Sequence, residues 1–414
     1  MSIPTIVETV GGYTFTWAKE RLTIAVNRVR VHTSDGRVTG EVLITTDTPG
    51  YSPILYPQSS LNFSASRSRH ELVNSLVSSY PDWQWAGIID QVAFHVQERA
   101  RLGEPVQEIW TSTEISPPEF LLEPILYKGL PTIVFGEKAV CKSLLALAFY
   151  ACLLLPWTDN PLGVVAPPRS VSTLLLDWEA DPDIAAYNAH RLQRGMELPP
   201  FPLYYRRCAL PLADDVTQIE HHVQAVHAEA VIVDSLGPAA GGDLKEPGQA
   251  LRFTAALRQL KVAALIVGQT SKEVDSKDAR KSVYGSTFFE YYARNIFHLR
   301  KVQEEGEDSL DLALFNTYCN LGKRHNPLGI HLNFNENGIH LQRQDVRTVA
   351  EFVHLLGTGA RILIYLRDAN RPVNSTDLAQ ALDLSQGATA MALKRLKDKG
   401  RIVKVGNEWG LSLL

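Results

Sequence analysis

The densest run of apolar positions lies between Pro131 and Leu155, where the sequence reads PTIVFGEKAVCKSLLALAFYACLLL. It begins with a short apolar stretch, residues 132–135, rich in residues that favour β-structure, and ends with a longer one, residues 144–155. A short apolar run bounded by glycine is typical of a buried strand, and a longer run is typical of a buried helix. The pattern therefore predicts a buried strand, a turn over residues 136–143 and a buried helix.

Further apolar runs follow this segment and alternate with helical patterns. They span residues 173–177, 203–206, 230–234 and 263–268. Strands that alternate with helices form a mostly parallel sheet covered on both faces. Three more predicted strands, residues 295–300, 311–315 and 329–334, follow closely, and the last leads to a hairpin turn at Asn337-Gly338. We therefore expect a core domain over residues 116–343 whose sheet ends antiparallel.

The first 115 residues show a different pattern. Apolar and polar positions alternate over residues 13–17, 21–26 and 40–45, with a turn at Ser34-Asp35-Gly36, and helical patterns span residues 66–80 and 85–102. This predicts a small α+β domain over residues 1–115, followed by a proline-containing linker over residues 114–128. Its role is left open between an accessory or assembly domain and direct recognition of nucleic acid or a partner.

Residues 344–414 are predicted to be mainly helical. Helical patterns span residues 346–356, 360–369, 375–382 and 386–399, with capping Ser or Thr at the start of the last two. Gly400 ends the last helix, and two short strands, residues 401–405 and 409–413, are joined at Gly406-Asn407. Three helices and a β-wing predict a winged helix-turn-helix domain.

Composition narrows the class of protein. A chain of 414 residues is too long for one ordinary core, and its net charge of −4 argues against a uniformly basic nucleic-acid coat. Its four cysteines form no C-x-x-C pair, which excludes the usual zinc and dithiol patterns and suits a reducing cytosol. The first residues lack a signal-peptide pattern, and no apolar run reaches the roughly 20 residues of a membrane span. We expect a cytoplasmic protein without a membrane partner.

The turn after the first core strand fits the phosphate-binding template G-x-x-x-x-G-K-[ST] at three of its four fixed positions. Gly136, Lys142 and Ser143 match, whereas Cys141 stands where the template has its second glycine. In such a loop the lysine neutralises the β- and γ-phosphates, and the hydroxyl binds Mg²⁺. The Cβ of Cys141 either weakens binding or reshapes the loop. The predicted nucleotide-binding residues are Gly136, Glu137, Lys138, Ala139, Val140, Cys141, Lys142, Ser143 and Leu144.

Carboxylates follow two other predicted strands. Asp177, Glu179 and Asp181 follow the second strand, and we favour Glu179 as the base that deprotonates an attacking water, the alternative being a solvated acidic loop. Asp234 ends the strand AVIVD and has the form of a Walker B carboxylate that holds Mg²⁺ together with Ser143.

An uncharged amide, Gln269, ends the next strand and could sense the γ-phosphate. The polar loop that follows, residues 271–286, is either a DNA-contacting loop or an ordinary solvated one. Its candidate DNA-binding residues are Lys272, Lys277, Arg280 and Lys281.

Together these segments resemble the RecA-type ATPase core, and they are similar to the hexameric replicative helicases of the RepA and DnaB type. The resemblance covers about residues 115–343. It implies that Glu179 is the catalytic glutamate found after the second strand in RecA-like proteins, and that Gln269 matches the glutamine at the end of a strand in that family. The tract GKRHNPLG, residues 322–329, resembles the helicase segment in which a Lys and an Arg reach the γ-phosphate of the neighbouring subunit. Lys323 matches the lysine, and the arginine is Arg324 or, in a gapless reading, is replaced by His325. A residue supplied in trans implies a homo-oligomer, with a hexamer expected.

The predicted recognition helix is basic and carries Lys394, Arg395 and Lys397 as candidate DNA-binding residues. From residue 385 onward there are six basic residues against Asp398 and Glu408, with Gln386 and Thr389 as candidate base readers. Winged helices also dock proteins, so DNA contact and protein docking both stay open.

The sequence thus predicts an α/β protein with a RecA-like core that uses ATP and Mg²⁺ and contacts single-stranded DNA in the core and duplex at the winged helix. The resemblance favours an ATPase that is a plasmid- or phage-type replicative DNA helicase. The alternatives are an ATP-regulated DNA-binding regulator, a recombination-type ATPase, and a degenerate P-loop scaffold protein in which Cys141 has ended catalysis.

Overall fold

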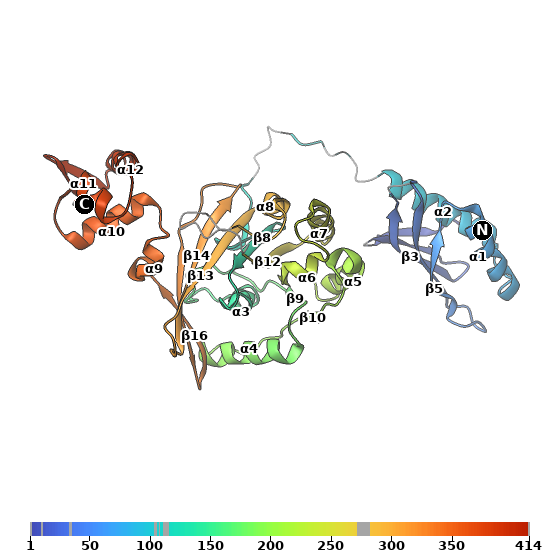
Figure 1. Ribbon diagram of the computed structural model, residues 1–414. Coiled ribbons are helices and arrows are strands. Elements are labelled where there is room, and N and C mark those ends of the chain that lie inside the picture. Colours follow the sequence, from blue (N-terminus) through green and yellow to red (C-terminus); the bar gives the residue numbers. More distant parts are fainter. Residues whose placement is uncertain are drawn as a thin grey trace. The chain divides into compact units, whose positions relative to one another are not determined.

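The computed structural model describes residues 2–9, 11–32, 35–102, 106, 108–110, 116–270 and 282–412 (Figure 1). The chain separates into two compact units, residues 1–117 with 215–225 and residues 118–214 with 226–414, and each is described by itself. Among the described residues, no helix is both long enough and apolar enough to span a bilayer.

The amino-terminal unit contains a five-stranded antiparallel meander whose strands pair in chain order. Its strands are β1 (Thr5–Thr9), β2 (Gly12–Trp17), β3 (Leu22–Val31), β4 (Val38–Thr46) and β5 (Ile54–Asn62). Alternate residues of β4 are buried, and these pack with β2, β3 and the helices α1 (Ser66–Ser79) and α2 (Trp85–Leu102) in one apolar cluster. The three predicted strands and both helices are present, whereas β1 and β5 were not predicted from the sequence.

The second unit is built on a nine-stranded sheet with the strand order β10-β9-β11-β12-β8-β13-β14-β15-β16. The parallel part consists of β8 (Pro131–Gly136), β9 (Thr173–Asp177), β10 (Tyr205–Arg207), β11 (Ala230–Asp234), β12 (Ala263–Gln269) and β13 (Asn295–Val302). The antiparallel part consists of β14 (Ser309–Cys319), β15 (Leu328–Asn335) and β16 (Gly338–Gln344). A mostly parallel sheet with an antiparallel end is what the sequence predicts.

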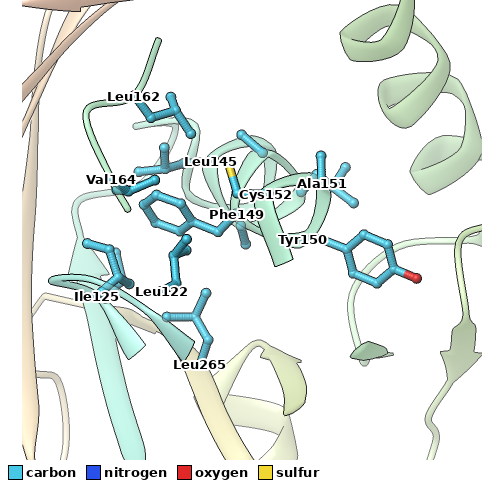
Figure 2. Packing of buried hydrophobic residues seen from close by; sticks show 14 of the residues in the cluster. Leu122, Ile125, Leu145, Phe149, Tyr150, Ala151, Cys152, Leu162, Val164 and Leu265 are labelled. Atoms are coloured by element: carbon cyan, nitrogen blue, oxygen red, sulfur yellow. The ribbon is translucent and has the colours of Figure 1, made fainter. Parts of the chain in front are cut away.

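The helix α3 (Lys142–Leu154) is the centre of this unit's main core (Figure 2). Every residue from Leu144 to Leu154 is buried, which is expected of a helix that is apolar all round. Strand residues such as Leu265 lie against α3 on one face of the sheet, together with Leu122. The Tyr150 hydroxyl is also satisfied, because it donates to the Pro202 carbonyl at 3.0 Å and accepts from the Tyr204 N–H at 2.9 Å.

Further helices connect the strands of this sheet along the chain (Figure 1). They are α4 (Pro182–Gly195), α5 (Leu212–Ala225), α6 (Leu236–Ala240), α7 (Pro247–Gln259) and α8 (Thr287–Tyr292). Of these, α4 contacts α3, and α6 contacts β11 and β12.

The second half of the segment predicted as a linker, residues 114–128, is not a linker in the structure. The structure forms a short hairpin there, β6 (Phe120–Leu122) and β7 (Leu126–Tyr127). Leu121, Leu122 and Ile125 are buried in the core around α3, so this part of the chain belongs to the core.

The carboxyl-terminal helices and wing follow β16. They are the 3₁₀ helix η1 (Val346–Thr348), α9 (Ala350–Val353), α10 (Thr358–Ala369), α11 (Ser375–Ala381) and α12 (Gln386–Asp398), with β17 (Val373–Asn374), β18 (Ile402–Val405) and β19 (Glu408–Leu411). The strands pair in the order β17-β19-β18, and an apolar cluster that includes Leu378, Leu393 and Ile402 joins the helices to the wing.

Two predictions for this region need correction, and one strand was not predicted. The single helix expected over residues 346–356 is two short pieces, because the chain is extended at Val349. The cap of α11 is Asn374, whose side chain accepts from the Asp377 N–H, while Ser385 caps α12 as predicted. The third strand of the wing, β17, was not predicted.

Candidate nucleotide-binding site

The carboxyl ends of four adjacent parallel strands, β8, β12, β11 and β9, meet at one edge of the sheet. Gly136 at the end of β8 pairs with Gln269 at the end of β12, and Asp234 at the end of β11 pairs with Asp177 at the end of β9. Ligands bind at this edge in open α/β sheets. The register therefore brings together segments that lie far apart in the sequence.

The loop between β8 and α3 leads from the end of the strand into the first turn of the helix, as a phosphate-binding loop does. Lys142 turns back over it, and its Nζ donates to the carbonyls of Gly136 at 3.2 Å and Glu137 at 2.6 Å. Ser143 is exposed in the first turn of α3, a helix long enough to present its amino-terminal N–H groups to an anion. Burial lowers the pKa of Lys142, and the carboxylates of Asp234 and Glu179 oppose that shift.

Two backbone positions explain which side chains this loop accepts. A Cβ on Gly136 would lie 2.7 Å from the Leu299 carbonyl oxygen, so only glycine fits there. Cys141, the N-cap of α3, has a φ of +57°, in the left-handed region that glycine adopts at least cost. The residue that departs from the template thus also occupies a conformation unfavourable for it. Its thiol is half-buried, and burial raises its pKa.

The other predicted loop residues differ in exposure. Lys138 and Ala139 are exposed, and Ala139 also has a positive φ, of 60°. Val140 and Leu144 are buried in the core around α3, so they can offer a ligand only their backbone groups.

Asp234 is buried beside this loop. Burial and the nearby carboxylates of Asp177 and Glu179 raise its pKa to about 6, and the neighbouring Ser143 hydroxyl and Lys142 ammonium oppose that shift. A buried carboxylate is stabilised either by a cation or by taking up a proton. Together, Asp234 and the Ser143 hydroxyl offer the oxygen ligands that Mg²⁺ prefers.

Glu179 lies at the same edge and is exposed. Its N–H donates to Oδ1 of buried Asp177 at 2.8 Å, and the N–H of Ala180 donates to the same oxygen at 2.9 Å. The Ser235 hydroxyl donates to Oε1 of Glu179. Asp181, the third carboxylate of this segment, is turned to an exposed ion pair with Arg207 at 2.5 Å.

Gln269 is the exposed last residue of β12, the strand between β8 and β11. Its carbonyl accepts from the Tyr284 N–H at 2.7 Å, and Thr270 pairs with Val283 in an isolated bridge. The candidate DNA-contacting residues Lys272, Lys277, Arg280 and Lys281 lie outside the described residues.

Lys323 and Arg324 are exposed in the connection between β14 and β15. Cys319, just before this loop, pairs with Asn295, which pairs with Thr132 near the start of β8. The next residue, His325, donates its N–H to Asn316 Oδ1 at 3.0 Å. The loop therefore begins near the start of β8, whereas the P-loop follows the end of that strand. The described contacts do not bring Lys323 or Arg324 to the chain's own Lys142.

In the winged-helix region, Lys394, Arg395 and Lys397 are all exposed on α12. Thr389 was predicted as a base reader, and this prediction was wrong. Its side chain is fully buried, and its hydroxyl donates to the Ser385 carbonyl at 3.0 Å. Gln386 is exposed at the start of the helix.

Sequence reasoning missed three features of the site. It noted Asp177 but not the turn that this residue makes for Glu179, and it gave Ser235 no role. It also missed Arg300 on β13, whose guanidinium lies 3.3 Å from the Glu137 carboxylate. A carboxylate two residues before Glu179 is the signal for an Asx turn, whereas nothing in the pattern marks Arg300.

Comparison with known proteins agrees with this geometry. Residues 97–275 match the AAA domain family, and residues 357–403 match the winged helix-turn-helix DNA-binding family. The sequence matches no curated protein. Among solved structures, it is similar to a KaiC-like protein from the hyperthermophilic archaeon Pyrococcus horikoshii OT3, at 15% identity over 57% of this chain and 99% of that chain, with a TM-score of 0.35. A TM-score this low carries no argument.

The mostly parallel sheet, the match to the AAA domain family and the match to the winged helix-turn-helix family agree with the predicted α/β core and carboxyl-terminal winged helix. The predicted fold class is confirmed. The roles of the individual site residues stay predictions.

Proposed function

We propose that this chain is a subunit of a hexameric, Mg²⁺-dependent ATPase that moves on DNA, as a replicative helicase of the plasmid or phage type. The observation that carries the proposal is the convergence of Lys142, Ser143, Asp234 and Glu179 at one sheet edge, in a chain that also carries a basic winged helix. Fold alone does not decide among DNA-acting ATPases, so the helicase activity rests on the resemblance stated above.

In this proposal Lys142 holds the β- and γ-phosphates, and Ser143 and Asp234 hold Mg²⁺, which supplies charge neutralisation when bound. Glu179 takes a proton from the attacking water, whose oxygen bonds to the γ-phosphorus as the bond to the bridging oxygen breaks. Gln269 reports the loss of the γ-phosphate. Lys323 and Arg324 complete the site of a neighbouring subunit, which agrees with their distance from their own P-loop.

The deciding experiment measures ATP hydrolysis with and without single-stranded DNA, and strand separation on a forked duplex, in the same preparation. We expect DNA-stimulated hydrolysis and ATP-dependent unwinding. The Lys142→Ala variant should lose both, by about 100-fold or more, with an unchanged circular dichroism spectrum. Lys128→Ala, which removes an exposed lysine paired with Glu119, is the matched control and should keep both activities.

Other outcomes identify the alternatives. ATP-dependent binding of duplex DNA without strand separation would indicate a DNA-binding regulator. Nucleotide binding without hydrolysis would indicate a degenerate scaffold. Unchanged hydrolysis in Lys142→Ala would reject the site itself.

A further inference from the structure

Ser235 is the N-cap residue of α6, yet its side chain does not cap that helix. Its carbonyl accepts a helical hydrogen bond from the Ala239 N–H at 3.2 Å. A serine at an N-cap ordinarily also accepts a hydrogen bond from an amide of the first turn. Here the hydroxyl instead donates to Oε1 of Glu179, just beyond the end of the neighbouring strand β9. The hydroxyl therefore serves the sheet edge rather than its own helix.

The two partners differ in their surroundings. Ser235 is only 3% exposed, whereas Glu179 is exposed. The main chain of Glu179 is held separately, through its N–H and Asp177. One contact thus fixes the backbone and a second fixes the carboxylate. Since Ser235 engages Oε1, the other oxygen, Oε2, remains able to accept a proton.

We propose that Ser235 is the positioning residue that orients the Glu179 carboxylate toward the attacking water. This inference rests on the proposed function, in which Glu179 is the general base. A general base must lie within hydrogen-bond reach of the proton that it removes, and an exposed glutamate otherwise samples several rotamers.

The step itself involves Glu179 rather than Ser235. The water proton passes to Glu179 Oε2, the water oxygen bonds to the γ-phosphorus, and ADP leaves with the electron pair of the broken bridging bond. Ser235 keeps its own proton throughout. Its loss should therefore slow the chemical step and leave substrate binding unchanged.

The test compares kcat and KM for ATP in Ser235→Ala, Ser235→Thr, Glu179→Gln and the double variant Ser235→Ala with Glu179→Gln. We expect Ser235→Ala to lower kcat about 10-fold or more, with KM changed by less than about twofold. Ser235→Thr keeps the hydroxyl and should retain most of kcat. Adding Ser235→Ala to Glu179→Gln should cause no further loss, because the residue acts only through Glu179. Thermal unfolding and the affinity for a fluorescent ATP analogue establish that each variant is folded and binds.

The outcomes separate the inference from the function on which it rests. If Glu179→Gln is inactive while Ser235→Ala turns over at the wild-type rate, only the inference fails. A rise in kcat in Ser235→Ala would also overturn it, since the hydrogen bond would then restrain the base from acting. If Glu179→Gln keeps the wild-type rate, the role proposed for Glu179 fails first. Should Ser235→Thr not fold, kcat and KM of Ser235→Ala still decide the question.

Discussion

At the residue scale, Cys141 occupies the point where the loop after β8 turns into α3. The template of such loops has glycine there, and the sequence alone suggested a problem of space near the phosphates. The structure adds a conformational reason, because Cys141 has a φ of +57°. The Cβ of Cys141 thus has two expected effects: it takes up space near the phosphates, and it makes the positive φ unfavourable. One substitution tests both.

We expect Cys141→Gly to raise the thermal stability and to tighten ATP binding. A left-handed conformation costs a non-glycine residue about 1 kcal/mol, which the substitution removes. Loss of the Cβ near the phosphates should lower the Kd for nucleotide by roughly 3- to 10-fold. Thermal unfolding and titration with a fluorescent ATP analogue measure the two effects. Cys141→Ala removes the thiol but keeps the Cβ, so it should bind like the wild type. Weaker binding in Cys141→Gly would show that the thiol contributes to the site.

Asp234 gives a prediction about pH. Its pKa is about 6 in the folded protein and 3.8 in a model peptide, so the folded state binds more protons between these values. Stability therefore falls as pH rises through this window, by up to roughly 3 kcal/mol for this group. Asp234→Asn carries no charge, so nucleotide-free Asp234→Asn should be more stable than the wild type at pH 8 and equal to it near pH 3.5. Thermal unfolding across this range measures the difference. An equal change in stability at both pH values would contradict the coupling between folding and protonation of Asp234. In a separate measurement, Asp234→Asn should lose Mg²⁺-dependent nucleotide binding.

At the element scale, the sequence predicts those helices and strands whose pattern of apolar residues follows from local geometry alone. The helix α2 was predicted with its observed bounds, and β8 and α3 followed from two uninterrupted apolar runs. The segment over residues 346–356 was misread because Val346, Val349 and Phe352 are apolar at helical spacing. They are buried together against Ala313 of β14, so tertiary packing produced the pattern without a continuous helix.

The recognition helix shows the opposite case, in which the pattern held more information than was used. Thr389, Leu393 and Leu396 lie four and seven residues apart, which puts them on one face of α12. All three are buried. The periodicity alone could therefore have excluded Thr389 as a base reader and assigned the basic residues to the exposed side.

The exposed basic residues of α12 lead to a prediction about DNA affinity. We expect the triple substitution of Lys394, Arg395 and Lys397 by alanine to weaken duplex binding and to make its dependence on log salt shallower by about 2 to 3. Fluorescence anisotropy at several salt concentrations measures both. The control replaces three other exposed lysines, Lys19, Lys128 and Lys261, with the same change in net charge. Equal losses in the two variants would indicate a general charge effect, and no loss in either would favour a protein-docking role for the winged helix.

At the scale of the whole molecule, the sequence predicted the segments of the candidate nucleotide site but could not show how they meet. Residues 136, 177, 234 and 269 are separated by whole helices, and only the strand order places them at one edge. The same register moves Lys323 and Arg324 away from their own P-loop. This placement is what the proposal of sites shared between subunits requires.

This arrangement predicts complementation between two inactive variants. In an oligomer with sites between subunits, Lys142→Ala lacks a working P-loop and a Lys323→Ala, Arg324→Ala double variant lacks the residues that it supplies to its neighbour. Each alone should hydrolyse ATP at less than about a hundredth of the wild-type rate. When equal amounts are mixed and allowed to exchange subunits, roughly a quarter of the interfaces combine an intact P-loop with an intact donor, and hydrolysis should recover to about that fraction.

A mixture of Lys142→Ala with Glu179→Gln is the control, because both changes lie on the same side of an interface and no mixed interface is complete. No recovery in the first mixture, with subunit exchange shown by labelled subunits, would contradict the proposal that Lys323 and Arg324 act in the site of a neighbouring subunit.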